Sequence, residues 1–194
     1  MTVTTPPHGD APGEARTPAP RSGVDSGSEA TAIDVVDEIH RFNAGREPER
    51  LAIKYRAMRR DAFSFLRGTA HLFNRRLARS SLPVASPAAW VCGDLHLENF
   101  GTFEGTDGRV HFDISDFDEA ALAPASWDVV RLGASLLVAS DALGTTPQAA
   151  RELCAACFGT YADALAAGRA GSPDRDNACK AITDLIDAVG HRSR

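Results

Sequence analysis

Two stretches decide the fold: residues 90–101 read WVCGDLHLENFG, and residues 112–120 read FDISDFDEA. The first opens with a short apolar segment bounded by glycine, which predicts a buried strand over 89–93. Between the two stretches, the turn-forming sequence GTDG separates apolar residues that alternate with polar ones. This pattern predicts a β hairpin over 102–114.

Oxygen-bearing side chains follow both predicted strands. Asp94 and Asn99 lie five residues apart directly after the first strand, and the hairpin ends at Asp116 and Asp118. A strand end exposes Asp94, and the returning hairpin brings the second acidic pair back beside it. We expect Asp94, Asn99 and Asp116 to converge around one divalent cation at the strand ends, because acidic clusters that fold together need a cation.

Helical periodicity dominates the rest of the sequence, so the predicted class is α+β and mostly helical, with one small β hairpin. Helices are expected over 33–42, from Pro48 to about 58, over 63–78, over 127–143 with Ser126 as its cap, from Pro147 to near 168, and over 177–189.

Composition bounds the domain organisation and the location. Residues 1–31 are rich in Pro, Gly, Ser and Thr and contain no apolar run, so we expect a disordered tail before a folded domain over 32–194. The chain has no secretory signal and no apolar run of the ~18 residues that a bilayer span needs, so we expect a cytoplasmic protein without a membrane partner.

Charge is sorted into two blocks. Residues 93–128 hold nine acidic residues against one basic residue, and residues 46–79 hold ten basic residues against three acidic ones. Together the blocks suggest a cation and a phosphorylated ligand, although two solvated faces that neutralise each other give the same pattern. The net charge of −5 and the lack of interleaved aromatic residues argue against nucleic-acid binding.

These motifs resemble those of two groups of proteins. The loop and the acidic strand end are similar to the aminoglycoside phosphotransferase and choline kinase relatives of protein kinases, whose loop reads HGDLHxxN and whose metal strand ends in IDF or IDW. With the FLRGT segment at 65–69 and the Trp127-Asp128 pair, the two stretches more closely resemble a bacterial family, domain of unknown function 2252. That similarity runs from about Leu51 to the C-terminus.

The resemblance implies a partial kinase-like fold and roles for single residues. Asp94 would be the catalytic base, or would orient the acceptor hydroxyl. Asn99 and Asp116 would bind Mg²⁺, with Asp118 close enough to help. His96 would contact the transferred phosphoryl group, and its alternative is loop packing or a hydrogen bond to Asp116.

Two further residues receive roles by the same route. Arg67 would bind the phosphates of the cofactor, and its alternative is an ion pair with an acidic loop residue. Asp128 would lie behind the site and brace the loop by accepting its backbone N–H groups.

The resemblance implies an ATP- and Mg²⁺-dependent phosphotransferase with an unidentified hydroxyl acceptor. Two alternatives stay open: a truncated pseudoenzyme that binds metal, nucleotide or a partner without turnover, and a metal-dependent phosphate-ester hydrolase. The glycine-rich turn and strand lysine of kinases are not visible, since Lys54 falls in a predicted helix and Lys180 near the end. We therefore expect a missing C-terminal portion or a complementing chain.

Overall fold

The computed structural model describes residues 34–80, 86–169, 171, 173, 175–176 and 178–190. All of them belong to one compact unit, Asp34–Arg194. The tail predicted over 1–31 lies outside the described residues, as does much of the connection between the fourth helix and the first strand.

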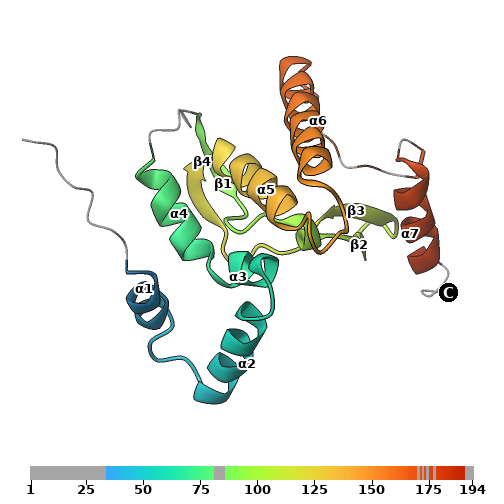
Figure 1. Cartoon of the computed structure of the whole chain (residues 1–194). Coiled ribbons are helices and arrows are strands. Elements are labelled where there is room, and N and C mark those ends of the chain that lie inside the picture. The colour runs from blue at the N-terminus through green and yellow to red at the C-terminus, as the bar shows by residue number, and fades with distance from the viewer. Residues whose placement is uncertain are drawn as a thin grey trace, which may run out of the picture. The chain divides into compact units, whose positions relative to one another are not determined.

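Within the described ranges the chain is α+β and mostly helical, with seven α-helices, one short 3₁₀ helix and four strands (Figure 1). The elements in chain order are α1 (Val35–Phe42), α2 (Pro48–Met58), α3 (Ala62–Gly68), α4 (Ala70–Ala78), β1 (Ala88–Val91), η1 (Leu97–Asn99), β2 (Phe100–Glu104), β3 (Val110–Ile114), β4 (Ala121–Pro124), α5 (Ser126–Val138), α6 (Pro147–Ala166) and α7 (Lys180–Gly190).

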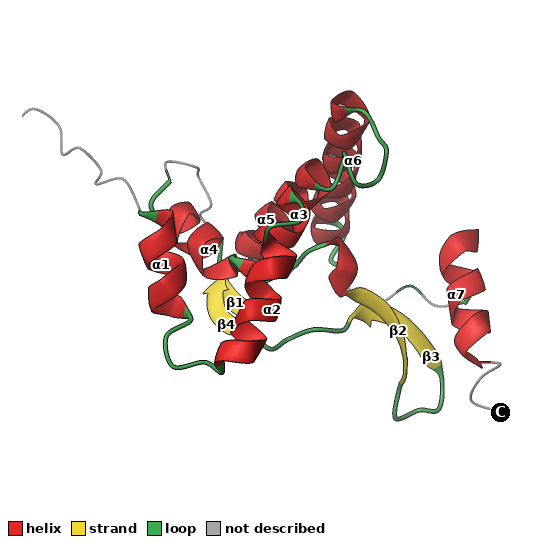
Figure 2. Cartoon of the chain, turned by 60° about the horizontal axis from the view of Figure 1, so that its bottom comes forward, coloured by secondary structure: helices red, strands yellow, loops and turns green. Residues whose placement is uncertain are grey.

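The strands form two antiparallel pairs, drawn in yellow in Figure 2. Strands β2 and β3 pair in register from Phe100 opposite Ile114 to Glu104 opposite Val110, which confirms the predicted hairpin. Helix α7 packs against this hairpin.

The second pair corrects the expectation of a single β element. Strand β1 pairs with β4, a segment for which the sequence predicted no strand. The Ala-Leu-Ala-Pro sequence of β4 has no β-branched residue, so only pairing with β1 makes it a strand. Strand β1 is also less buried than predicted, because Val91 is buried but Trp90 is 80% exposed.

The single helix expected over 63–78 is two helices that break at Thr69. Its backbone leaves the helical region at φ −131° and ψ 37°, and its hydroxyl donates to the carbonyl oxygen of Phe65 at 2.7 Å. Such bonding from a side chain to the preceding turn bends helices. The preceding Gly68 lies against Met58, where a larger side chain would collide with the methionine. The break lets α3 and α4 pack on different neighbours.

Helix α5 packs closely on α6 and ends earlier than predicted, at Val138 instead of near residue 143. Gly133 lies so close to the ring of Phe158 that a Cβ atom there would overlap it, and the Cys154 thiol donates to the carbonyl oxygen of Gly133 at 3.3 Å. The chain beyond α5 turns at Gly144, whose φ is +63°.

The buried apolar side chains come from helices α2 to α4, from β1 and the segment after it, and from the region of helices α5 to α7: Met58, Phe63, Leu72, Leu77, Val91, Cys92, Leu95, Leu136, Ala139, Ala150, Cys154 and Ile186. Leu95 therefore anchors that segment in the core. Among the described helices, none combines the length and apolarity that crossing a bilayer would require.

Candidate functional site

The candidate site is built on two segments, the 93–99 loop after β1 and the 116–119 turn after β3. Gly93 brings them together. Its φ is +84°, and a Cβ atom at this position would collide with the backbone carbonyl oxygen of Glu119. Only glycine combines that backbone conformation with so close an approach. The two segments therefore lie in backbone contact.

Side chains from other elements fix the start of the 93–99 loop. The carboxylate of Asp128, in the first turn of α5, accepts from the N–H groups of Cys92 at 2.8 Å and Gly93 at 3.1 Å. The amide of Asn74, in α4, donates to the carbonyl oxygen of Gly93 at 3.2 Å. The contacts of Asp128 are those expected of a residue that lies behind the site and braces the loop.

Asp94 is held by Arg131 of α5, whose side chain is 1% exposed. The guanidinium donates from Nε to Oδ1 of Asp94 at 2.9 Å and also from Nη2. Nη2 further donates to the carbonyl oxygen of Leu66 at 2.7 Å, and the guanidinium lies 4.8 Å from the ring centre of Phe73. The buried Nη1 atom has no hydrogen-bond partner among the described residues.

This environment affects the basicity of Asp94. Burial raises the pKa of Asp94 above its ordinary value, Arg131 and Arg67 oppose that increase, and the charge of Glu119 adds to it. The carboxyl group is 19% exposed, so Asp94 still reaches solvent. Arg131 fixes one oxygen of this partly desolvated carboxylate, and a general base needs such a fixed orientation and raised basicity.

His96 packs inside the same loop. Its Nδ1 accepts from the N–H of Glu98 at 3.2 Å, and its ring meets that of Phe63 edge-on at 5.9 Å. Burial, aided by the charges of Arg67 and Arg131, lowers the pKa of His96 to about 4. The imidazole is therefore neutral at pH 7 and serves the loop's packing. Contact with a phosphoryl group stays a prediction.

Asn99, the last residue of the loop, has a buried side chain with an amide oxygen left unsatisfied by the described residues. The residue is 3% exposed, and its Oδ1 is buried without a hydrogen-bond partner among the described residues. Its backbone carbonyl accepts from the N–H of Ser115 at 2.8 Å and from the hydroxyl of the same serine at 2.9 Å. Asp116 directly follows Ser115 in the chain, so these two hydrogen bonds keep the backbone of Asp116 close to that of Asn99.

The 116–119 turn is open to solvent. Asp116 and Asp118 are both exposed, and Oδ1 of Asp116 accepts from the N–H of Asp118 at 3.2 Å. The charge of Asp116 reaches His96, whose pKa it raises against the larger effect of burial. Among the described residues, no three His, Cys, Asp or Glu side chains gather as a metal-binding group. The expected convergence of Asp94, Asn99 and Asp116 on one cation stays a prediction.

Arg67 lies at the edge of the site, at the end of α3. Its guanidinium pairs with Glu98 of the 93–99 loop, and the two side chains are 44% and 56% exposed. This is the ion pair that the sequence left open as the alternative to phosphate binding. An exposed pair of this kind contributes ~0–1 kcal/mol to stability, so a competing anion can displace Glu98 at little cost.

Sequence reasoning did not assign the role of Arg131. Its signal is nevertheless present, because Arg131 interrupts an otherwise apolar stretch of α5 three residues after Asp128. Positions three apart share one face of a helix. A charged residue on a buried face needs an acidic partner, and both Asp128 and Asp94 are candidates for that partner in the sequence.

The comparisons with known proteins extend over most of the chain. A family described as "Uncharacterized protein conserved in bacteria (DUF2252)" matches residues 46–192. The match includes the 93–99 loop, the 116–119 turn and Arg131. No curated protein and no solved structure matches the chain.

Proposed function

The chain belongs to the DUF2252 family of bacterial proteins, and from the site that it carries we propose that it is part of a phosphotransferase that uses ATP and Mg²⁺ and has a hydroxyl acceptor. One observation carries the proposal: the 93–99 loop holds both an oriented carboxylate, Asp94, and a buried amide oxygen without a partner, Asn99 Oδ1. A buried acceptor without a partner calls for an explanation, and an absent ion is one.

Asp94 is the residue assigned to the proton. With Oδ1 held by Arg131, Oδ2 is left to accept the hydrogen bond of the acceptor hydroxyl. The hydroxyl oxygen forms a bond to the γ-phosphorus as the bond from that phosphorus to the β-phosphate oxygen breaks. The hydroxyl proton passes to Asp94, and ADP leaves. Desolvation raises the pKa of Asp94 and makes it a better proton acceptor than an exposed aspartate.

The protein ligands proposed for Mg²⁺ are Asn99 Oδ1 and the carboxylate of Asp116. Both are oxygen donors, and Mg²⁺ is usually bound by one or two protein groups together with phosphate oxygens and water. When bound, the ion would neutralise charge on the phosphates. The backbone bonds from Ser115 to Asn99 keep the two donors on neighbouring segments. Arg67 could exchange Glu98 for a phosphate oxygen, as its exposed position allows.

One observation favours a second candidate, a protein that binds the same ligands without turnover. One carboxylate oxygen of Asp94 accepts hydrogen bonds from the buried Arg131, which also donates to the carbonyl oxygen of Leu66. An ion pair of this kind can be a structural link between α3, the 93–99 loop and α5, with no chemistry attached. The two candidates differ in turnover, since both require the nucleotide.

The experiment measures binding and turnover separately on the full chain and on Asp94→Asn. Binding is followed as the rise in melting temperature with ATP, with and without Mg²⁺. Turnover is followed as ADP release and label transfer from [γ-³²P]ATP to a panel of aminoglycosides, amino alcohols, sugars and proteins. Asp141→Asn is the matched control, because Asp141 is an exposed aspartate between α5 and α6.

Phosphotransfer predicts a Mg²⁺-dependent rise in melting temperature for all three proteins. Turnover should fall ~10²- to 10⁴-fold in Asp94→Asn, as expected for loss of a general base, and stay unchanged in Asp141→Asn. Binding in all three proteins without label transfer to any acceptor would support the second candidate. A melting temperature indifferent to ATP and Mg²⁺ would contradict both.

A further inference from the structure

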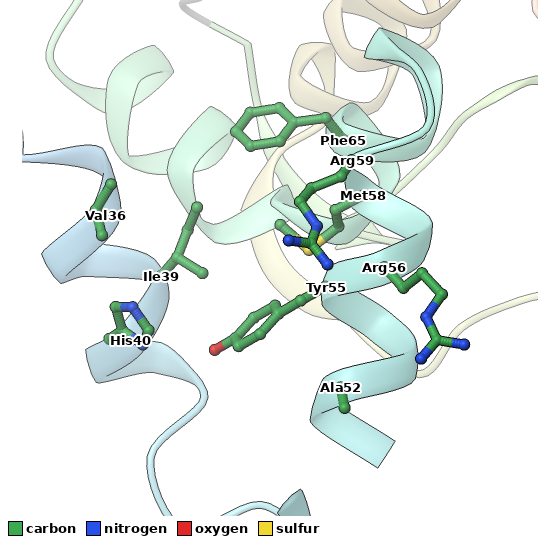
Figure 3. A pocket seen from close by; sticks show the side chains of 9 residues that line it. All are labelled: Val36, Ile39, His40, Ala52, Tyr55, Arg56, Met58, Arg59 and Phe65. Atoms are coloured by element: carbon green, nitrogen blue, oxygen red, sulfur yellow. The ribbon is translucent and has the colours of Figure 1, made fainter. Parts of the chain in front are cut away.

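A cavity of about 460 Å³ lies among α1, α2 and α3, in a part of the chain that the proposed chemistry does not use (Figure 3). Its volume is within the range of small-molecule pockets. Helices α1 and α2 pack mainly on other elements, α1 on α4 and α2 on α3. Between α1 and α2 they leave a space that none of the described residues fills.

The wall of the cavity is mostly apolar. Val36 and Ile39 come from α1, Met58 from α2 and Phe65 from α3. Two of these side chains still face solvent, since Val36 is 62% exposed and Phe65 is 39% exposed. Covering them would remove apolar surface from water, which is the main favourable contribution to binding in such pockets.

The polar groups at the cavity are cationic or neutral, and none of the described residues that line it is acidic. Arg56 and Arg59 are three residues apart on α2 and its C-terminal cap. Neither forms an ion pair with a described residue, whereas Arg41, Arg50 and Arg75 each pair with a glutamate. Two arginines without carboxylate partners beside an apolar wall give the cavity a preference for an anion.

The two arginines are not equivalent. Figure 3 shows the Arg56 side chain turned away from α1, while the guanidinium of Arg59 lies on the α1 side of α2. The same view shows the Tyr55 hydroxyl pointing toward α1, and the Tyr55 ring meets His40 edge-on at 5.9 Å. Arg59 and Tyr55 thus offer an ionic donor and a neutral donor on the α1 side of α2, beside the apolar wall.

We propose that this cavity binds a small amphipathic carboxylate, with its apolar body against Val36, Ile39, Met58 and Phe65 and its carboxylate on Arg59. The planar guanidinium fork matches a carboxylate in two parallel hydrogen bonds. A monoanion suits the site better than a phosphate dianion, because one arginine and one hydroxyl cannot compensate the desolvation of a second charge. The proposal is independent of the 93–99 loop.

The test uses decanoate, below its micellar range, as the probe on the full chain, with binding measured by isothermal titration calorimetry. Decanol is the neutral ligand of the same length. The variants are Arg59→Gln, which removes the ionic partner, and Ala52→Trp, which fills the cavity from α2. Arg50→Gln is the matched control. This substitution removes the same charge from α2, but Arg50 does not line the cavity.

We expect decanoate to bind with a sub-millimolar Kd. Arg59→Gln should weaken it about tenfold or more, a loss typical of a charge-assisted bidentate pair. Ala52→Trp should abolish binding, and Arg50→Gln should change the Kd less than about twofold. Circular dichroism would establish that each variant is folded.

Three results would overturn the proposal. The first is no heat of binding for decanoate with the folded wild-type chain. The second is an equal loss of affinity in Arg59→Gln and Arg50→Gln, or equal binding of decanol, since either would remove the role of the carboxylate. The third is co-sedimentation with phosphatidylglycerol vesicles without binding of monomeric decanoate, because the apolar wall would then serve a lipid surface.

Discussion

The two segments of the candidate site differ in what holds them. The 93–99 loop is bonded by side chains from α4 and α5 and anchored in the core by Leu95. The 116–119 turn is exposed, and the hydrogen bonds that its described residues make are local: the N–H of Asp118 donates to Asp116, and the N–H of Ala120 donates to Phe117. The first segment is thus fixed before any ligand arrives, while the second keeps freedom to adjust to one.

This difference separates two kinds of contribution. Residues of the 93–99 loop should affect folding and function together, because the same bonds serve both. Residues of the 116–119 turn should affect ligand binding with little effect on folding. The predictions below challenge this separation, beginning with the largest expected loss of stability.

Gly93→Ala should cause the largest loss. The substitution places a Cβ atom against the carbonyl oxygen of Glu119 at a backbone φ of +84°. We expect the free energy of unfolding to fall by at least about 3 kcal/mol, and the melting temperature by roughly 6–12 °C. Gly108→Ala is the control, because its φ is +71° but an added Cβ meets nothing within 4 Å. That variant should lose only ~1–2 kcal/mol. Equal losses would mean that the contact between the segments is not rigid.

Arg131→Met should cause the next largest loss, about 2–4 kcal/mol, because it leaves Asp94 partly buried without its partner. The double variant Asp94→Asn with Arg131→Met removes the unpaired charge and should recover part of that loss. Urea denaturation of the wild type, both single variants and the double variant measures the coupling. Losses that simply add would show that the pair contributes nothing to the rigidity of the loop.

The pH dependence of the Arg131→Met variant follows from the raised pKa of Asp94. A carboxyl group with a raised pKa in the folded state destabilises that state as pH rises from its ordinary value, about 4, through the raised one. Arg131 opposes the increase, so its removal should widen the window. The single variant should lose stability between pH 4 and 7 more steeply than the wild type. The double variant should not.

His96 should make the loop sensitive to acid. The unfolded chain protonates this histidine near pH 6.5, whereas the folded chain does so at about 4. Its contribution to stability is full above pH 6.5 and is lost as pH falls from 6.5 to 4. By pH 5 the loss should approach ~2 kcal/mol.

His96→Asn tests this origin of the acid sensitivity. Asparagine keeps an acceptor for the N–H of Glu98 but does not titrate, so denaturation curves at pH 7 and pH 5 should lie closer together than in the wild type. An unchanged difference in His96→Asn would place the acid sensitivity elsewhere.

What the sequence predicted well is local. The alternation over β3 and the glycine-rich turn before it predict the hairpin, since both signals lie within about 15 residues. The same is true of α6, which begins at Pro147 as its cap and proline indicate.

What the sequence did not predict depends on distant partners. Strand β4 exists because β1 pairs with it across some 30 residues, and its own composition gives no sign of a strand. The partner of Arg131 lies 37 residues earlier in the chain. Periodicity detects neither of these, because each is a tertiary contact.

Asp116→Asn should have the smallest effect on folding and therefore gives the sharpest test of the separation. Asparagine keeps the Oδ1 acceptor for the N–H of Asp118, and the site is exposed, so the free energy of unfolding should change by less than about 0.5 kcal/mol. Loss of the carboxylate charge should nevertheless weaken Mg²⁺ binding, and the Mg²⁺-dependent part of the ATP-induced rise in melting temperature should disappear. Asp141→Asn should keep that rise. If Asp116→Asn also keeps the Mg²⁺-dependent rise in melting temperature, the 116–119 turn does not bind the ion. The solvent exposure of the turn would then have no connection with ligand binding.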